Sequence, residues 1–291
     1  MVISLVNIVI DGIMIGALYA IFAAGLSLIF GVMRLVNLAH GDLIVVAAYF
    51  ILIAAQRLGL SIFVAVVLVA PLMFVIGYAL QTILLNRVLG DDILPPLLVT
   101  FGLSIILQNG ALALFSADSR RLPAFGLENA SLLLGPFPIG VLPLMTLAAA
   151  VLVIFLLNRL LYATAIGRAF RAVSDDSTTA QLMGVSNRRI FGVAMGLALA
   201  LCTVAALFLG ARTNFDPTIG PGRLILAYEA VIIGGLGSLW GTLAGGIILG
   251  LAQVAGASIN PEWQLLAGHL AFLAMLVVRP RGLFPQLRDA A

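Results

Sequence analysis

The sequence predicts an all-α integral membrane fold, a polytopic bundle of about eight or nine transmembrane helices. Of the 291 residues, 63% are hydrophobic and only 9% are charged, whereas soluble domains have roughly 45–50% apolar and about 25% charged residues. Long apolar runs also recur along the whole chain, with no polar half that could form a separate soluble domain. We therefore expect one transmembrane domain over residues 1–291.

The candidate spans follow from length and hydrophobicity. A helix needs about 20 mostly apolar residues to cross the hydrocarbon core, where lipid offers the backbone no hydrogen-bond partners. The first six candidates cover residues 5–30, 40–56, 61–85, 95–115, 138–158 and 190–210. The rest of the apolar sequence divides into a short segment at 224–236, a glycine-rich segment at 239–257 and a last span at 263–278.

The short segment 224–236 predicts a broken element. At 1.5 Å per residue it is about 20 Å long, too short for a core of about 30 Å. Three glycines in four positions would also weaken a helix near Gly237. We expect two helical segments that meet there, at either a flexible gate or a structural kink. The alternative is one re-entrant hairpin, which would give eight spans instead of nine.

The arginines predict the orientation, because positively charged loops stay in the cytoplasm. Arginines gather after the fifth span at Arg159, Arg168, Arg171, Arg188 and Arg189, and in the tail at Arg279, Arg281 and Arg288. Both regions are cytoplasmic only if an even number of crossings separates them, which nine spans provide. The N-terminus is then outside. No arginine precedes Arg34, so the first span lacks the basic region of a secretory signal and should be retained.

Several functions are excluded by residues that the sequence lacks. The formal charge of +3 comes from arginines in short loops, which does not favour nucleic-acid binding. The sequence contains no lysine, so it has neither a phosphate-binding GxxxxGK[ST] loop nor an amine for a Schiff base. A single cysteine, Cys202, allows no disulfide framework. We expect no cofactor and no enzyme activity, and any ATP hydrolysis must occur on a separate chain.

Polar residues inside the spans are candidates for a solute path, because an ionisable group costs about 2.5–3.5 kcal/mol at a helix centre. Of the two carboxylates inside spans, Glu229 in the short segment is the better candidate for the solute path, since Asp11 lies close to a membrane interface. The motif NLAHGD provides one histidine and one aspartate, too few ligands for zinc, so we expect no metal. The fourth span carries a stripe of polar residues, which a solute path and interhelical hydrogen bonding explain equally well. The candidates are Asn37, His40, Asp42, Thr100, Ser104, Gln108, Tyr228 and Glu229.

Small residues at four-residue spacing allow helices to approach closely. Gly12 with Gly16, and Gly192 with Gly196, show this spacing near the start and in the sixth span. The glycines that serve either as a gate or in packing are Gly234, Gly235, Gly237, Gly241 and Gly245.

The loop at residues 167–190 is the most polar cytoplasmic loop. Asp175 and Asp176 precede a segment from Ser177 to Met183 and are well placed to cap a helix there, which would end at Gly184. Such a helix along the cytoplasmic face is either a tether or the docking site of a motor domain.

Three stretches resemble the branched-chain amino acid ABC transporter permeases of the LivH-like type. They are GALYAIFAAGLSLIFGVMRLVNLAHGD near the start, RAVSDDSTTAQLMGVSNRRI in the loop and RPRGLFP at the end. Two further stretches, LLVTFGLSIILQN and AVIIGGLGSLWGTLAGG, are also similar, and all five occur in the order found in the family. Together they touch most of the chain.

The resemblance implies a type II ABC importer fold and alternating access driven by ATP. It implies a second homologous permease subunit, two cytoplasmic ATPase subunits and a periplasmic substrate-binding protein, at the bacterial inner membrane. The loop at 167–190 would carry the coupling helix, although Thr178 and Thr179 stand where Ala or Glu is usual. The coupling residues implied by the resemblance are Asp176, Ser177, Ala180, Gly184, Val185, Arg188 and Arg189.

Other functions stay open at this point. Related permeases carry urea, short amides or aromatic acids, and selectivity depends largely on the separate binding protein. A secondary transporter or a channel also uses broken helices and polar groups at the midplane, and would transport without an ATPase. A membrane enzyme using His40 and Asp42 is the third class, but no nucleophile motif accompanies these residues.

Overall fold

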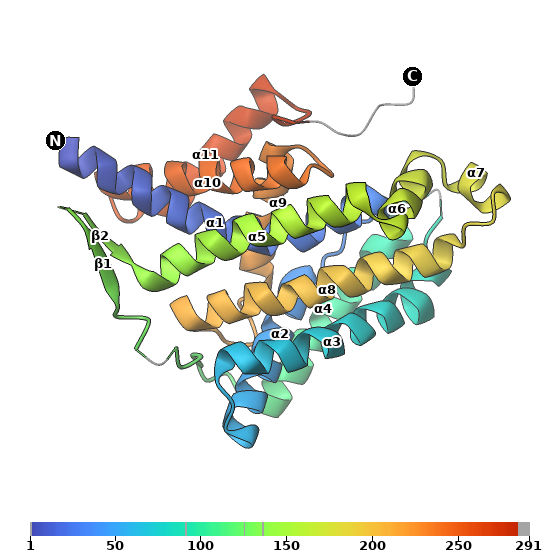
Figure 1. Ribbon diagram of the computed structural model, residues 1–291, viewed down its shortest axis with the longest axis horizontal. Helices are drawn as coiled ribbons and strands as arrows, with labels where there is room; N and C mark the ends of the chain where they lie inside the picture. Colours follow the sequence, from blue (N-terminus) through green and yellow to red (C-terminus); the bar gives the residue numbers. More distant parts are fainter. Residues whose placement is uncertain (1, 91, 125, 136, 285–291) are drawn as a thin grey trace.

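The computed structural model describes residues 2–90, 92–124, 126–135 and 137–284, and helices dominate them (Figure 1). The long helices are α1 (Val2–Met33), α2 (His40–Leu58), α3 (Ile62–Ala79), α4 (Leu94–Phe115), α5 (Val141–Ala163), α8 (Asn187–Arg212) and α10 (Leu239–Ile259). The shorter helices are α6 (Ala165–Asp175), α7 (Ser177–Leu182), α9 (Gly220–Gly234) and α11 (Trp263–Val278). A π-helical turn, η1 (Leu80–Leu84), and a 3-10 turn, η2 (Leu85–Arg87), extend α3.

The helical membrane fold that the sequence predicts is confirmed. Within the described residues, seven helices are long and apolar enough to cross a membrane, and α11 is a shorter apolar helix. Helix α9 occupies the position of the short segment, and the chain breaks between Gly234 and Leu239 as expected. It begins at Gly220 rather than near residue 224, because Pro221 suits the first turn of a helix.

A small β-hairpin is the main departure from the purely helical prediction. Strands β1 (Ser131–Leu134) and β2 (Phe137–Gly140) pair antiparallel, with Ser131 opposite Gly140. The fifth span was expected from residue 138, but α5 begins only at Val141. The backbone of Gly140 is extended, and the N–H of Val141 donates to the carbonyl of Ala130, so the ladder continues up to the start of the helix.

The loops that the arginine distribution assigns to the cytoplasm lie together at one end of the molecule. Figure 1 shows α6 and α7 at this end, called the α7 end, and the β-hairpin at the opposite one, called the hairpin end. At the α7 end, Ser174 Oγ donates to the carbonyl of Gly31 at 2.6 Å. Asn86 Nδ2 donates to the carbonyl of Arg188 at 3.3 Å. The membrane side of this end stays a prediction.

The two halves of the chain repeat one arrangement in opposite directions. In each half a long helix is followed by a non-helical break, a helix that begins inside the protein and two further helices: α1 to α4, then α8 to α11. The long helix of each half packs along the third helix of the other, α1 on α10 and α8 on α3. Because α1 runs toward the α7 end and α8 runs away from it, the halves are inverted, a pattern common in transporters (Figure 1).

Glycines form the closest of these helix contacts. A Cβ added to Gly16 on α1 would lie 2.5 Å from the carbonyl oxygen of Gly246 on α10. One added to Gly77 on α3 would lie 2.7 Å from the carbonyl oxygen of Met195 on α8. Only glycine permits such backbone proximity. These contacts place α1 at the centre, where 83% of its most apolar stretch is buried, against 17% for α4.

Candidate functional site

The break between α1 and α2 returns the chain into the protein. Arg34 has a φ of 51°, unusual for a residue with a side chain, and it turns the chain back along α1. His40, the first residue of α2, is 1% exposed, and its Nε2 lies 3.1 Å from the carbonyl oxygen of Phe22. Phe22 lies about three turns before the end of α1. Helix α2 therefore begins deep inside the protein.

Polar side chains of α4 form hydrogen bonds with the segment around the break between α1 and α2. Ser104 Oγ donates to Asp42 Oδ2 at 2.5 Å, and Gln108 Nε2 donates to Ser104 Oγ at 3.0 Å. One turn earlier, Thr100 Oγ1 accepts the N–H of Leu38 at 3.2 Å. The structure thus brings the predicted residues of the fourth span together with those of the NLAHGD motif. Their hydrogen bonds join helices that are far apart in the sequence.

The first turn of α9 meets the first turn of α2 at Asp42. A Cβ added to Gly41 would lie 2.1 Å from the carbonyl oxygen of Gly220, and one added to Gly220 would lie 2.1 Å from Asp42 Oδ1. Asp42 is 2% exposed, and its Oδ1 has no hydrogen-bond partner. The positive ends of two helix dipoles therefore surround one carboxylate. The close packing leaves no space for a solute, so this arrangement suits a structural anchor.

The imidazole of His40 has few partners besides Phe22. The Sγ of Cys202 on α8 lies 3.8 Å from both ring nitrogens. Across the described residues, no group of three His, Cys, Asp or Glu side chains could hold a metal ion. His40 therefore lies in a small, mostly apolar contact between α1, α2 and α8.

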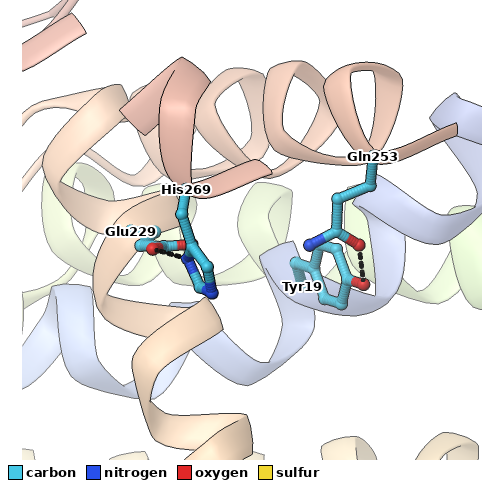
Figure 2. A network of polar contacts seen from close by, with 4 residues as sticks. All are labelled: Tyr19, Glu229, Gln253 and His269. Atoms are coloured by element: carbon cyan, nitrogen blue, oxygen red, sulfur yellow. Dashed lines mark hydrogen bonds and ion pairs between the residues drawn. The ribbon is translucent and has the colours of Figure 1, made fainter. Parts of the chain in front are cut away.

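Glu229 forms a separate polar site with a partner that sequence reasoning missed. Its Oε1 lies 2.5 Å from Nδ1 of His269 on α11, as Figure 2 shows. The side chain of Glu229 is 6% exposed, whereas that of His269 is 43% exposed. An imidazole accessible from the outer surface of α11 thus connects a buried carboxylate to the surroundings. The sequence did contain one signal for such a partner: Glu229 is a carboxylate inside a span, and a carboxylate there needs a polar partner.

Beside this pair, Tyr19 on α1 donates its hydroxyl hydrogen to Gln253 Oε1 on α10 at 2.5 Å (Figure 2). Gln253 is 0% exposed, and its Nε2 has no hydrogen-bond partner, nor has Glu229 Oε2. The network therefore keeps one unused buried donor and one unused buried acceptor. Such groups are costly unless water or a solute visits them.

Tyr228 precedes Glu229 on α9 but belongs to the other group. Its buried hydroxyl has no hydrogen-bond partner and lies close to the backbone of Asn37, in the break between α1 and α2. The predicted path residues therefore form two groups, one around Asp42 and one around Glu229. Of the predicted residues, only Glu229 itself belongs to the second group.

The loop between α5 and α8 contains the expected short helix. Asp176 caps α7, because its Oδ1 accepts the N–H groups of Thr178 and Thr179 at 2.9 and 3.0 Å. Hydrogen bonds from Thr179 hold the pKa of Asp176 below its usual value. After α7, Gly184 has a φ of 87°, the left-handed conformation that glycine favours at a helix end.

The coupling residues that the resemblance implies differ in their exposure. Ala180 is 5% exposed, so its small side chain packs within this chain. Leu182 and Met183 are instead 83% and 80% exposed. Ser177, Arg188 and Arg189 are also exposed, and Val185 is half-buried. Leu182 and Met183 are therefore the exposed apolar side chains of this loop, and sequence reasoning did not select them.

The glycine-rich break forms a tight hairpin between α9 and α10. A Cβ added to Gly241 would lie 2.2 Å from the carbonyl oxygen of Gly234, and one added to Gly245 would lie 2.1 Å from that of Ala230. Gly235 and Gly237 both have positive φ angles, 104° and 81°. The first two glycines permit close packing and the last two permit the turn. Whether the turn also moves as a gate stays a prediction.

Comparison with known proteins gives the family. The family model described as "Branched-chain amino acid transport system / permease component" matches residues 8–278, nearly the whole chain. The chain belongs to this permease family. Its helical fold, with seven helices long enough to span a membrane, makes it a multi-pass membrane protein.

Individual relatives cover similar lengths. The high-affinity branched-chain amino acid transport system permease protein BraD of Pseudomonas aeruginosa is 27% identical over 94% of this chain and 94% of its own. LivH of Escherichia coli K12, with the same description, is 27% identical over 94% and 93%. LivM of the same strain is 26% identical over 93% of this chain and 68% of its own. No solved structure matches the chain.

Proposed function

We propose that this permease is the transmembrane subunit of an ATP-driven importer for branched-chain amino acids in the bacterial inner membrane. The names of BraD and LivH support this substrate class, because the similarity to each of them covers nearly the whole chain. The inverted halves and the broken helices support alternating access. The Glu229–His269 pair is the better candidate for the solute path, since the Asp42 cluster is closed by backbone contacts.

Exposed apolar residues at the end of α7 carry the proposal of ATPase coupling. Leu182 and Met183 are more than three-quarters exposed in a polar loop, where no lipid tails would cover them. The cap by Asp176 and the left-handed Gly184 fix the two ends of this short helix. We place one ATPase subunit on this surface, with residues 167–190 as the cytoplasmic coupling loop. ATP hydrolysis then occurs on the partner chain.

The assembly would contain two permease subunits, two ATPase subunits and a periplasmic substrate-binding protein. LivH and LivM of one strain are both similar to this chain, which supports a related second permease as its partner. The hairpin end, with β1 and β2, is the proposed periplasmic face that receives the binding protein.

The coupling proposal is tested by replacing both Leu182 and Met183 with serine in the complex purified with its partner chains. Burial of each side chain in an interface contributes about 1.5–3 kcal/mol, so ATPase binding should weaken at least about a hundredfold. Leu133→Ser is the matched control, since Leu133 is 77% exposed but lies in the hairpin. ATPase retention and leucine uptake in proteoliposomes are measured. Wild-type retention in the double variant would make the loop a tether and favour a secondary transporter.

A further inference from the structure

A cavity of about 300 Å³ lies at the α7 end, apart from both polar groups described above. It is enclosed by the last turns of α1, the corner between α5 and α6, and the turn between α9 and α10. This volume is at the lower end of small-molecule sites.

Two opposite charges on α6 line this cavity without binding each other. Arg171 and Asp175 are four residues apart, so both lie on one face of the helix. Among the described residues, neither forms a salt bridge. The guanidinium of Arg171 lies 4.9 Å above the ring of Tyr162, which fixes its position at the cavity wall. A ligand that carries a negative and a positive group on one carbon atom would satisfy both charges.

The inner part of the cavity is apolar apart from one hydroxyl. Leu28, Val32 and Phe170 line it and are at most 4% exposed. Ser27 also lines it, is 0% exposed, and its Oγ has no hydrogen-bond partner. A buried hydroxyl without a partner is unusual in a protein interior and suits a polar group of a ligand. The cavity therefore combines separated charges at its mouth with an apolar wall behind them.

We propose that this cavity binds a free α-amino acid with an aliphatic side chain, which enters from the solvent at the α7 end. Arg171 binds the carboxylate and Asp175 binds the ammonium group. The aliphatic side chain packs among Leu28, Val32 and Phe170. A zwitterionic lipid headgroup shares the pair of charges, but its two acyl chains exceed the apolar part of so small a cavity.

Binding there would regulate import, and this step rests on the proposed function. The cavity is also lined by Gly237, in the turn between α9 and α10, and by Ser174, which is hydrogen-bonded to Gly31. An occupant would hold α6, and with it the coupling loop, against this turn. Amino acid that accumulates at the α7 end would then slow its own import.

Binding is measured on the full-length chain purified with its partner chains, without ATP and without the binding protein. The probes are leucine, N-acetyl-leucine, which lacks the ammonium group, and leucine methyl ester, which lacks the carboxylate. Wild-type protein should bind leucine about ten- to hundredfold more tightly than either analogue. Asp175→Asn should lose the preference over N-acetyl-leucine, and Arg171→Gln the preference over the ester. Arg168→Gln, exposed on the same helix, is the control.

A zwitterionic lipid headgroup is the competing ligand, because it carries the same pair of charges. The binding experiment is repeated in nanodiscs of phosphatidylethanolamine and of phosphatidylglycerol, with mass spectrometry of lipid retained on the protein. Equal leucine affinity in both supports the proposal. Retained phosphatidylethanolamine that leucine does not displace and that Arg171→Gln releases would overturn it in favour of a lipid site. Leucine binding that neither variant changes would also overturn it.

A transport experiment separates this proposal from the proposed function. Proteoliposomes with the α7 end inside are loaded with leucine, and ATP-driven uptake is compared with that of empty ones. Wild-type uptake should fall at least about fivefold, and Arg171→Gln should remove this inhibition. Uptake without inhibition in the wild type contradicts the regulatory step alone. Absence of any ATP-driven uptake contradicts the proposed function, while the binding result still decides the site.

Discussion

Two buried carboxylates in this permease have opposite relations to the surroundings. Asp42 is bound by Ser104 and lies against the backbone of Gly220, at the meeting point of two helix N-termini. Glu229 is equally buried, but its partner His269 is 43% exposed on the outer surface of α11. The comparison teaches that two equally buried carboxylates can differ in their access to the surroundings. The difference lies in the partner side chain, which is exposed only for Glu229.

The largest effect should come from Gly220→Ala, which tests the closed character of the Asp42 cluster. The new Cβ would lie 2.1 Å from Asp42 Oδ1 and 2.8 Å from the backbone nitrogen of Asp42, so α2 and α9 must separate. We expect a loss of at least about 3 kcal/mol and little folded protein in the membrane. Gly222→Ala is the control, because a Cβ there meets nothing within 4 Å. A normal yield of Gly220→Ala would show that the cluster has room to open.

Asp42→Asn should have a smaller effect, on stability. The amide would place a donor beside the positive ends of two helices and weaken the bond from Ser104, at a cost of about 1–3 kcal/mol. Thermal unfolding in detergent measures this loss. Combined with Ser104→Ala, the effects should be non-additive by about 0.5 kcal/mol or more. Asn109 is exposed on the same helix as Ser104, so the effect of Asn109→Ala on stability should simply add to that of Asp42→Asn. Reduced transport with unchanged stability would instead assign Asp42 to the path.

Glu229→Gln should have the smallest effect on stability and a clear effect on transport. The amide oxygen can still accept the hydrogen bond from His269, so we expect a change below about 1 kcal/mol in unfolding. Uptake should fall at least about tenfold, and His269→Gln should add nothing further, because the two residues act as a pair. Glu262→Gln, exposed between α10 and α11, is the control. Normal uptake by Glu229→Gln, or its failure to insert, would remove the path role.

Local features of the fold were predictable from the sequence. The membrane class follows from the proportion of apolar residues, and the break after Gly234 follows from glycines in adjacent positions. The cap of α7 by Asp176 and its end at Gly184 also follow, because each involves residues within a few positions. The β-hairpin was missed, since its apolar strands resemble the start of a span.

Long-range features of the site were only partly predictable. Asp42 and Ser104 were both candidates from their positions in spans, but nothing in either segment showed that they bind each other across 62 positions. His269 was not selected from the sequence, and its bond to Glu229 depends on how α11 packs on α9. The burial of Ala180 was not predictable for the same reason, because burial depends on neighbours from other helices.

The sequence by itself determined the helices, their breaks and the arginine-rich loops, because hydrophobicity, helix capping and charge are properties of short segments. The tertiary structure alone decided that α2 and α9 begin inside the protein with their N-termini together, that Glu229 has an outward-facing partner, and that two charges of α6 line one cavity. The first of these features arises where backbones approach across glycines. Such an approach depends on the shapes of both helices at once, which neither segment specifies alone.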